Sequence, residues 1–404
     1  MTKTIWYISK YCAISSKNSF GSRGWLLMEE FSKKGHKIVV ITSQNNSYNN
    51  EYENKSYSFF VKNIKVVILK TVKYYFSKSL KRVISWFDFE FKLFRLDKKF
   101  LPNPDIIIIS SLSLLTILNG IYFKKKYGCK LVFEVRDIWP LTLVELGGFS
   151  NNNPLIKLLS FIEKIGYEKS DIIVGTMPNL SEHVRKILGY NKTVYFIPMG
   201  ISKDMLKNKK KEIPQYIKNH LKTDDFNIVY SGTFGMTNSL STFFEAAKVL
   251  KAYPKIKFVI FGDGDLRKSY IKRYGYLPNL IYFSKVQKNL VQCFLSYADV
   301  LYFSAFKSKV YDYGQSANKF IDYMISGKPI IASYSGYYSM INEANCGYFI
   351  PAENVSALVN KIKELIKVPK SERNIMGARG LSWLIKNRKY EKLADDYLAF
   401  LFKN

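Results

Sequence analysis

A strand–loop–helix–strand pattern opens the chain: TIWYISK (4–10), YCAISSKNSFGSRG (11–24), WLLMEEFSKKG (25–35) and HKIVVIT (36–42). The first and last of these segments have the character of buried strands, and the third carries apolar side chains at helical spacing. Gly35 suits the C-cap of that helix, because glycine takes the left-handed conformation without strain. The pattern therefore predicts a βαβ unit, with its strands parallel in one sheet.

The same alternation recurs and predicts parallel sheets that helices cover on both faces. In the first half of the chain, further strands are expected at 104–110, 130–135, 170–176 and 193–200. A polar, Lys-rich segment at 201–224 follows, which we interpret as a linker or a peripheral helix. The alternation then restarts, with strands expected at 226–232, 255–264, 280–286, 299–305 and 328–333.

We infer two doubly wound α/β domains that face each other across a cleft. The expected bounds are 1–205 for the first domain, 206–380 for the second and 381–404 for a closing C-terminal helix. The length of 404 residues agrees, because a single core rarely extends beyond about 300 residues. In such sheets ligands bind beyond the carboxyl ends of the strands, so functional residues are expected in the loops there.

Charge and composition narrow the possible functions. Hydrophobic residues make up 47% and aromatic residues 16%, which excludes a disordered or fibrous chain. Lys and Arg number 62 against 32 Asp and Glu, a formal net charge of +30. Such a charge points to nucleic acid, acidic lipid headgroups or phosphorylated ligands, although AT-rich coding would also produce it.

The sequence lacks the signals of several other classes of protein. The four cysteines lie far apart without a C-x-x-C pair, which suits a reducing compartment, and with three histidines no metal site is legible. The G-x-S-x-G motif of one hydrolase class is absent, and the N-terminus lacks the apolar run of a signal peptide. The longest apolar run, 106–118, is too short to cross a bilayer, so we do not expect an integral membrane protein.

The densest group of candidate residues lies in SANKFIDYMISGKPIIAS (316–333). A loop leads there into a helix that carries Lys319 and Asp322 on one face, with Ser316 and Asn318 beside them. Unpaired amides at a helix start favour a diphosphate, to which Lys319 adds a positive charge. Asp322 suits two adjacent ribose hydroxyls. The alternative is an ordinary surface ion pair between the two charged side chains.

Three glycine-bearing loops offer further candidates: YSGTFG (230–235), FGDGD (261–265) and SFGSRG (19–24). Glycine lets a backbone approach a ligand closely, or simply makes a tight turn. FGDGD lacks the third glycine of a dinucleotide fingerprint. The candidate residues in and beside these loops are Gly232, Thr233, Gly235, Gly262, Arg267, Gly21 and Arg23. The last of these would meet a phosphate or a sugar, or else only solvate its loop.

A charged pair, Arg136–Asp137, directly follows a strand in VFEVRDIWPLTLVELGG (132–148), and Trp139 and Glu145 lie further along. An aromatic ring beside charged groups suits a sugar, which has an apolar face to stack and hydroxyls to bond. The alternative is a buried structural salt bridge at the strand end.

The segment KTVKYYFSKSLKRVISWFDFEFKLFRLDKKF (70–100) holds nine basic, three acidic and nine aromatic residues. Basic residues interleaved with aromatic ones are typical of a helix that lies at an anionic headgroup layer. The segment therefore predicts a docking surface for a lipid-linked acceptor. The alternative is an amphipathic core helix with a solvated Lys face.

Several of these motifs resemble those of the family-4 glycosyltransferases of GT-B fold. SANKFIDYMISGKPIIAS is similar to the donor-binding signature of that family, and YSGTFG, the 19–42 region and IPMGIS (197–202) are similar to its other motifs. VRDIWP…ELG with ANKFIDYM most resembles the bacterial O-antigen and capsule subgroup that transfers N-acetyl-L-fucosamine. Two features depart from the family: Gly314 replaces a usual Glu, and residues 234–238 offer no cation for the diphosphate.

The resemblance implies a retaining, metal-independent hexosyltransferase without a cofactor, whose C-terminal helix returns to the first domain. That domain would bind the acceptor, a saccharide on undecaprenyl diphosphate, and the second domain a UDP-sugar. Lys319 would hold the diphosphate and Asp322 the ribose, while Arg136 and Asp137 would contact the sugar or the acceptor. The implied location is cytoplasmic, peripheral on the inner membrane, with 70–100 at its anionic surface.

Two other functions stay open. A nucleotide-sugar epimerase of the same two-domain fold would need an acid/base pair near the sugar, and the chain has few histidines to supply one. A nucleic-acid-binding protein is suggested by the charge of +30. No helix-turn-helix, RNA-recognition or zinc pattern accompanies it, so we expect no nucleic-acid partner.

Overall fold

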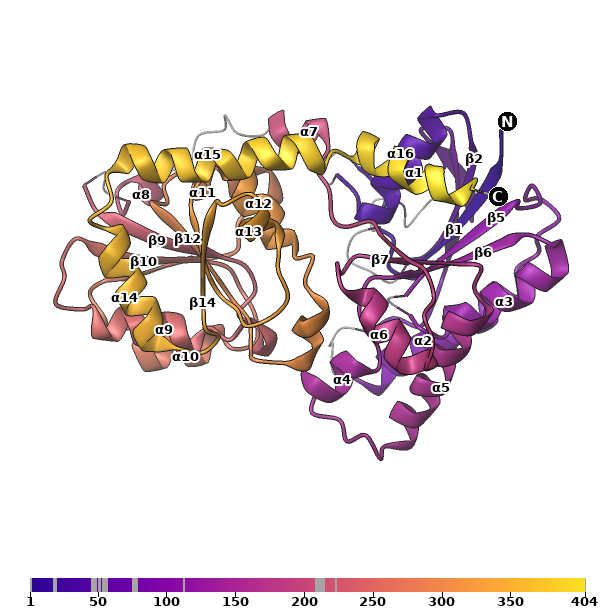
Figure 1. Ribbon diagram of the computed structural model, residues 1–404, viewed down its shortest axis with the longest axis horizontal. Helices are drawn as coiled ribbons and strands as arrows, with labels where there is room; N and C mark the ends of the chain where they lie inside the picture. Colours follow the sequence, from indigo (N-terminus) through magenta and orange to yellow (C-terminus); the bar gives the residue numbers. More distant parts are fainter. Residues whose placement is uncertain are drawn as a thin grey trace. The chain divides into compact units, whose positions relative to one another are not determined.

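The computed structural model describes residues 2–16, 20–44, 49, 52, 57–74, 79–111, 113–207, 215–221 and 224–403. It divides the chain into two compact units, and each is described by itself. Unit 1 comprises Met1–Pro198 together with Tyr390–Asn404, and unit 2 comprises Met199–Lys389. Both are α/β units built on a parallel sheet, which confirms the predicted fold class (Figure 1).

The sheet of unit 1 is parallel except at one edge, where the outermost strand runs antiparallel to its neighbour. Its strands, in spatial order, are β3 (Ser58–Val61), β4 (Ile64–Leu69), β2 (Lys37–Ser43), β1 (Thr4–Ile8), β5 (Ile106–Ser110), β6 (Lys130–Val135), β7 (Ile172–Gly175) and β8 (Val194–Phe196). The central strands β1 and β5 are buried along their whole length, as their unbroken apolar runs predict.

Helices cover both faces of this sheet (Figure 1). One face carries α1 (Arg23–Lys33) and α16 (Tyr390–Leu401), which pack against each other. The other face carries α2 (Leu80–Arg95), α3 (Thr116–Tyr127), α5 (Pro154–Lys169) and α6 (Leu180–Leu188), while the short α4 (Leu141–Glu145) follows β6. Residues 390–401 therefore complete a core that residues 5–197 begin.

The sheet of unit 2 is parallel throughout. Its strands, in spatial order, are β11 (Leu280–Phe283), β10 (Ile256–Phe261), β9 (Phe226–Ser231), β12 (Val300–Ser304), β13 (Ile330–Ser333) and β14 (Gly347–Ile350). One face carries α9 (Ser241–Val249), α10 (Arg267–Tyr274) and α14 (Val355–Leu365), and the other α11 (Val291–Leu295), α12 (Asn318–Ser326) and α15 (Lys370–Asn387) (Figure 1). The short helix α13 (Met340–Glu343) precedes β14.

The Lys-rich segment expected as a linker or peripheral helix contains two short helices, α7 (Lys203–Lys207) and α8 (Gln215–Lys218). Residues 208–214, 222 and 223 of that segment lie outside the described part of the chain, as do residues 75–78 of the basic aromatic segment and Ser19 of the first glycine loop. Among the described residues, no helix has both the length and the apolar run that crossing a bilayer requires.

Helix α16 supplies buried apolar side chains to unit 1, and we expect its inner face to matter for stability. Leu393 is 2% exposed, so Leu393→Ala should lower the free energy of unfolding by about 2–5 kcal/mol. The neighbouring Lys392 makes only an exposed ion pair with Asp396, so Lys392→Ala should cost less than about 0.5 kcal/mol.

Denaturant unfolding followed by tryptophan fluorescence measures this difference, because all of the five tryptophans except Trp383 lie in unit 1. Equal stabilities of the Leu393→Ala and Lys392→Ala proteins would contradict the assignment of α16 to the core of unit 1.

Candidate functional site

Lys319 lies in the first turn of α12, which follows the carboxyl end of β12. Its Nζ donates hydrogen bonds to Tyr230 Oη at 2.7 Å and to Asn238 Oδ1 at 2.5 Å. The ammonium also sits 4.6 Å from the centre of the Tyr230 ring. Burial lowers the pKa of Lys319 to about 7. An anion bound here would contact a cation that two hydrogen bonds already orient and that is poorly hydrated.

Two properties of α12 favour an anion beside Lys319. The helix begins after Ala317 without a side-chain cap, so backbone amides of its first turn are left for a ligand. Asp322 lies one turn further on, and its burial raises the pKa of its carboxyl to about 6, against the opposing effect of Lys288. Among the described residues, Lys319 and Asp322 form no ion pair, so the surface-pair alternative does not hold.

The loops after β9 and β10 approach each other and Lys319 at glycines. A Cβ at Gly232 would lie 2.3 Å from Lys319 Cε, and a Cβ at Gly262 would lie 1.8 Å from the Gly232 carbonyl oxygen. Neither position has room for a side chain, because other parts of the protein lie there, and the close approach of a ligand to these loops stays a prediction. Gly235 differs, because its φ is −101° and a Cβ there would find its nearest atom 3.5 Å away. Nothing in the structure therefore requires glycine at 235.

The other donor-site candidates differ in whether they contact the surroundings of Lys319. The carbonyl oxygen of Thr233 accepts from Tyr230 and Asn238, so Thr233 belongs to the frame that holds the ammonium. Asn318 precedes Lys319 and is exposed. Ser316 Oγ accepts from the Met199 amide at 2.9 Å. Arg267 starts α10 and interacts electrostatically with Tyr282 rather than with Lys319 or Asp322.

Sequence reasoning missed Tyr230 and Asn238 as partners of Lys319. Asn238 lies in the stretch that was expected to contribute no cation, and it contributes an acceptor instead. Tyr230 looks like one more apolar residue of a buried strand. The signal that could have identified Tyr230 is its hydroxyl group near the end of a buried strand, just before a glycine loop.

Gly314, where the family has a Glu, adopts φ +94° and ψ 179°. Residues other than glycine rarely adopt this conformation, because their Cβ collides with the backbone. The glycine at position 314 therefore goes together with the backbone conformation there. Restoring a Glu at this position would strain the turn after the short helix at Lys309–Tyr313.

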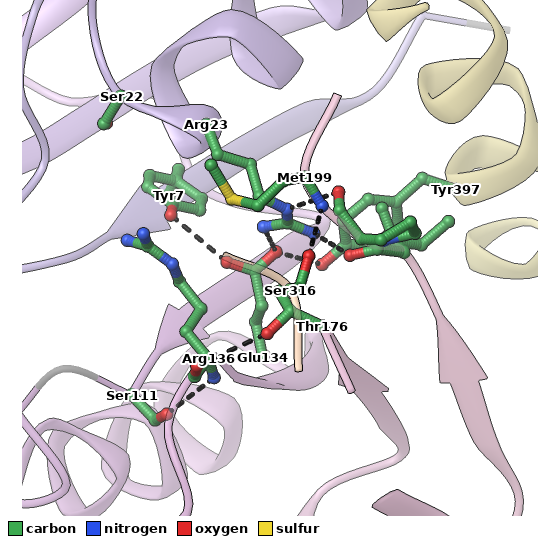
Figure 2. Close-up of polar contacts among 12 residues, drawn as sticks. Tyr7, Ser22, Arg23, Ser111, Glu134, Arg136, Thr176, Met199, Ser316 and Tyr397 are labelled. Carbon is green, nitrogen blue, oxygen red and sulfur yellow. Dashed lines mark hydrogen bonds and ion pairs between the residues drawn. The ribbon is translucent and has the colours of Figure 1, made fainter. Parts of the chain in front are cut away.

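In unit 1 the structure corrects the expectation for Arg23, whose side chain is completely buried. Its Nη1 forms an ion pair with Glu134 Oε2 at 2.7 Å, and its Nε and Nη2 donate to the carbonyl oxygens of Pro198 and Ile197 (Figure 2). Neither a phosphate nor a sugar is the partner of this guanidinium. The buried salt bridge that was weighed for Arg136–Asp137 exists here, but between Glu134 and Arg23.

Two tyrosines complete the surroundings of Glu134. Tyr7 donates to Glu134 Oε1 at 3.2 Å, and Tyr397 of α16 donates to Oε2 at 3.4 Å. Burial alone would raise the pKa of Glu134, but the charge and hydrogen bond of Arg23 hold it below its usual value, with a smaller contribution from Arg136. The carboxylate therefore stays ionised without contact with water.

Arg136 differs from Arg23 in what its side chain contacts. Within the described part of the chain, its guanidinium makes no hydrogen bond or ion pair, while its backbone is fixed by Ser111 and Thr176. Figure 2 shows the Arg136 guanidinium beside Tyr7 and apart from the Arg23–Glu134 contact. Of the two arginines, only Arg136 therefore stays a candidate for contact with a ligand.

The neighbours of Arg136 organise their own loop. Both carboxylate oxygens of Asp137 accept hydrogen bonds, from the Trp139 indole at 3.0 Å and from the Thr142 hydroxyl at 2.6 Å. The Trp139 ring packs edge-on against Trp86 with 5.2 Å between ring centres.

The two remaining candidates of unit 1 lie at the ends of local elements. Glu145 ends α4 and is half-buried. Gly21 has φ +83° and lies against Trp25, so it shapes the turn that enters α1.

Comparison with known proteins agrees with this two-part architecture. Residues 25–204 match the family model described as Glycosyltransferase Family 4, and residues 212–383 match Glycosyl transferases group 1. None of the curated protein sequences matches the chain.

Solved structures of similar fold cover nearly the whole chain. Sucrose-phosphate synthase from Thermosynechococcus elongatus is 14% identical with a TM-score of 0.72, over 99% of this chain and 98% of that one. Anabaena HepE in complex with UDP and glucose is 11% identical with a TM-score of 0.67, over 99% of both chains. A structure described as trehalose-6-phosphate from E. coli bound with UDP-2-fluoro glucose is 14% identical with a TM-score of 0.73, over 98% of both. The likeness establishes the GT-B fold.

The two arginines of unit 1 should respond differently to truncation. Arg23→Ala would leave the Glu134 carboxylate buried and unpaired, so we expect the free energy of unfolding to fall by about 3–5 kcal/mol. Arg136→Ala removes no paired group and should cost about 1 kcal/mol or less. Denaturant unfolding of both variants measures the difference. A loss for Arg136→Ala as large as that for Arg23→Ala would show that Arg136 is also structural.

Proposed function

We propose a function from the premise that the chain is built of a Glycosyltransferase Family 4 domain followed by a Glycosyl transferases group 1 domain, which makes it a glycosyltransferase. In this proposal it transfers an N-acetylated hexosamine or deoxyhexosamine, first of all N-acetyl-L-fucosamine, from a UDP-sugar. The acceptor is a saccharide on undecaprenyl diphosphate, at the cytoplasmic face of the inner membrane. The product is part of an O-antigen or capsule polysaccharide.

One observation carries the donor half of the proposal: the largely buried Lys319 ammonium beside the uncapped start of α12. The leaving group of a UDP-sugar is a diphosphate whose negative charge grows as the glycosidic bond breaks. A preorganised ammonium and helix-terminal amides stabilise such charge most where water is excluded. Asp322, one turn along α12, would accept from the ribose hydroxyls. Neighbours of the same fold are described with UDP or a UDP-sugar bound.

Transfer in this proposal retains the configuration of the anomeric carbon and uses neither a metal ion nor a protein nucleophile. The bond from the anomeric carbon to the diphosphate oxygen breaks, and the acceptor oxygen bonds to the same face of that carbon. The proton of the acceptor hydroxyl passes to the departing phosphate oxygen. Unit 1 would bind the acceptor, and the Arg136 guanidinium would contact its sugar or a phosphate; this proposal is supported by the lack of a hydrogen-bond or ion-pair partner for that guanidinium among the described residues.

Nucleotide binding to the purified protein tests the donor site. UDP should bind in the presence of EDTA, and more tightly than ADP or GDP. Lys319→Ala should weaken UDP binding roughly tenfold to hundredfold, because it removes a charge-assisted contact to phosphate. Asp322→Ala should weaken UDP but leave inorganic diphosphate binding nearly unchanged. Lys272→Ala, an exposed lysine of α10, is the control. Undiminished UDP affinity in Lys319→Ala would exclude this site.

The lowered pKa of Lys319 predicts proton uptake on binding. With a pKa of about 7 the free side chain is mostly neutral at pH 8, whereas Asp322, with a pKa of about 6, is already ionised. The terminal phosphate of UDP is ionised as well, since its second pKa is roughly 6. A diphosphate favours the charged ammonium and raises the pKa of Lys319, so binding takes up a proton and weakens as the pH rises above 7.

Calorimetric titration with UDP at pH 8 in buffers of different ionisation enthalpy measures the uptake. Lys319→Arg is the matched variant, because arginine is protonated with and without ligand. We expect uptake in the native protein and none in this variant. Equal uptake in both proteins would mean that another group titrates.

A further inference from the structure

Helix α2 carries a second apolar stripe on the side that faces away from the sheet. Successive residues of an α-helix are turned by about 100°, so five apolar side chains of α2 fall within an arc of about 80°. They are between 49% and 82% exposed: Leu80, Ile84, Phe87, Phe91 and Phe94. The buried side of α2 lies opposite and consists of Ser85, Trp86, Phe89 and Leu93. A surface helix normally places polar residues where this stripe lies.

The stripe continues onto the neighbouring helix α3. Phe94 packs on Tyr122 with 5.0 Å between ring centres, and Tyr122 is itself 41% exposed. Leu118, one turn before Tyr122 on α3, is 44% exposed. The α2–α3 surface, as we call Leu80, Ile84, Phe87, Phe91, Phe94, Leu118 and Tyr122, is thus one connected apolar area rather than scattered side chains.

The helices of the α2–α3 surface also carry exposed cations. Lys81 and Arg95 belong to α2, Lys99 follows it closely in sequence, and Lys125 and Lys126 belong to α3. The Arg95 guanidinium lies 5.0 Å from the centre of the Phe91 ring, at the edge of the stripe. The acidic side chains of α2 are engaged, because Asp88 pairs with Lys92 and Glu90 accepts hydrogen bonds from Ser113, Thr116 and Asn119.

Polar contacts on the inner side fix how α2 is turned. Lys10 Nζ, which is buried, donates to the Ser85 carbonyl oxygen at 2.9 Å and to its hydroxyl at 2.6 Å. The Trp86 indole donates to Tyr11 Oη at 2.9 Å. Rotating α2 to bury the stripe would break these bonds and take the hydrogen bonds to Ser85 away from the buried Lys10 ammonium. The contacts that hold α2 in unit 1 therefore keep the stripe exposed.

We propose that the α2–α3 surface docks on an anionic phospholipid bilayer. The aromatic and aliphatic side chains would enter the level of the headgroups, while the exposed cations attract acidic lipids. A nucleic acid would use the cations but not the stripe, and a second copy of the chain would bring two sets of cations together. The inference deepens the proposed function, since it brings unit 1 to the surface where a lipid-linked acceptor lies, but the docking itself does not depend on transferase activity.

Flotation with vesicles tests the proposal on the full chain. We expect the protein to float with vesicles of equal parts phosphatidylglycerol and phosphatidylcholine, and much less with phosphatidylcholine alone. The triple variant Ile84→Ser, Phe87→Ser, Phe91→Ser removes the centre of the stripe without touching the inner side of α2. Its control is Tyr276→Ser, Tyr338→Ser, Ile375→Ser, which removes equally exposed side chains of unit 2. Only the first variant should lose flotation.

A charge variant separates the two parts of the surface. Replacing Lys81, Arg95 and Lys99 by Ser should weaken binding to anionic vesicles by roughly a hundredfold. Flotation that neither variant reduces would overturn the proposal. A dimer in sedimentation equilibrium that the stripe variant dissociates, without vesicle binding by the native protein, would assign the surface to a second copy instead.

Measuring UDP binding in the absence of lipid distinguishes a failure of the docking proposal from a failure of the proposed function. The stripe variant and the charge variant should both bind UDP as the native protein does, because neither changes a residue of unit 2. Vesicle binding without any UDP binding would leave the docking surface standing and remove the proposed function. UDP binding without vesicle binding would do the reverse.

Discussion

The joining of α1, β6 and α16 in unit 1 depends on an ion pair between two fully buried side chains. Glu134 at the end of β6 and Arg23 at the start of α1 are 111 residues apart, and both side chains are fully buried. Their contact fixes where α1 begins relative to the sheet, and Arg23 also holds the carbonyl oxygens of residues 197 and 198. Tyr397 brings α16 to the same carboxylate. Charges buried this way are costly unless every polar group has a partner, and here the partners come from four separate parts of the chain.

In unit 2 the corresponding constraint is steric. The loops after β9 and β10 meet so closely that a single added carbon at Gly262 would overlap the Gly232 carbonyl oxygen, and one at Gly232 would displace Lys319. Tyr230 and Asn238 then hold the ammonium through two hydrogen bonds. The Lys319 side chain can extend from α12 to the loop after β9 only because Gly232 carries no side chain in its way.

The sequence predicted what depends on local pattern. Continuous runs of Ile and Val predicted buried parallel strands. The start of the helix at Lys319 was predicted from the preceding loop and the helical periodicity. Patterns over a few residues could not show that Arg23 pairs with Glu134, or that Lys319 rests on Tyr230 and Asn238, since these partners lie 81 to 111 residues away. Strands β3, β4 and β14 were not predicted: β3 and β14 are only partly buried, whereas β4 is apolar and buried like the strands that were predicted, and its run IKVVIL was overlooked. The charged and aromatic content of 70–100 was evident, but not the direction in which its aromatic rings point.

The division of the chain also has a consequence for the order in which the protein is made. Unit 2 is continuous, whereas unit 1 takes in residues 390–404 after the whole of unit 2. A ribosome therefore releases all of unit 2 before it releases Leu393, Tyr397 and Leu401, which belong to the core of unit 1. Until then the apolar side chains of α1 that pack against α16 lack these partners. During translation, the half that is synthesised first is the half that is completed last.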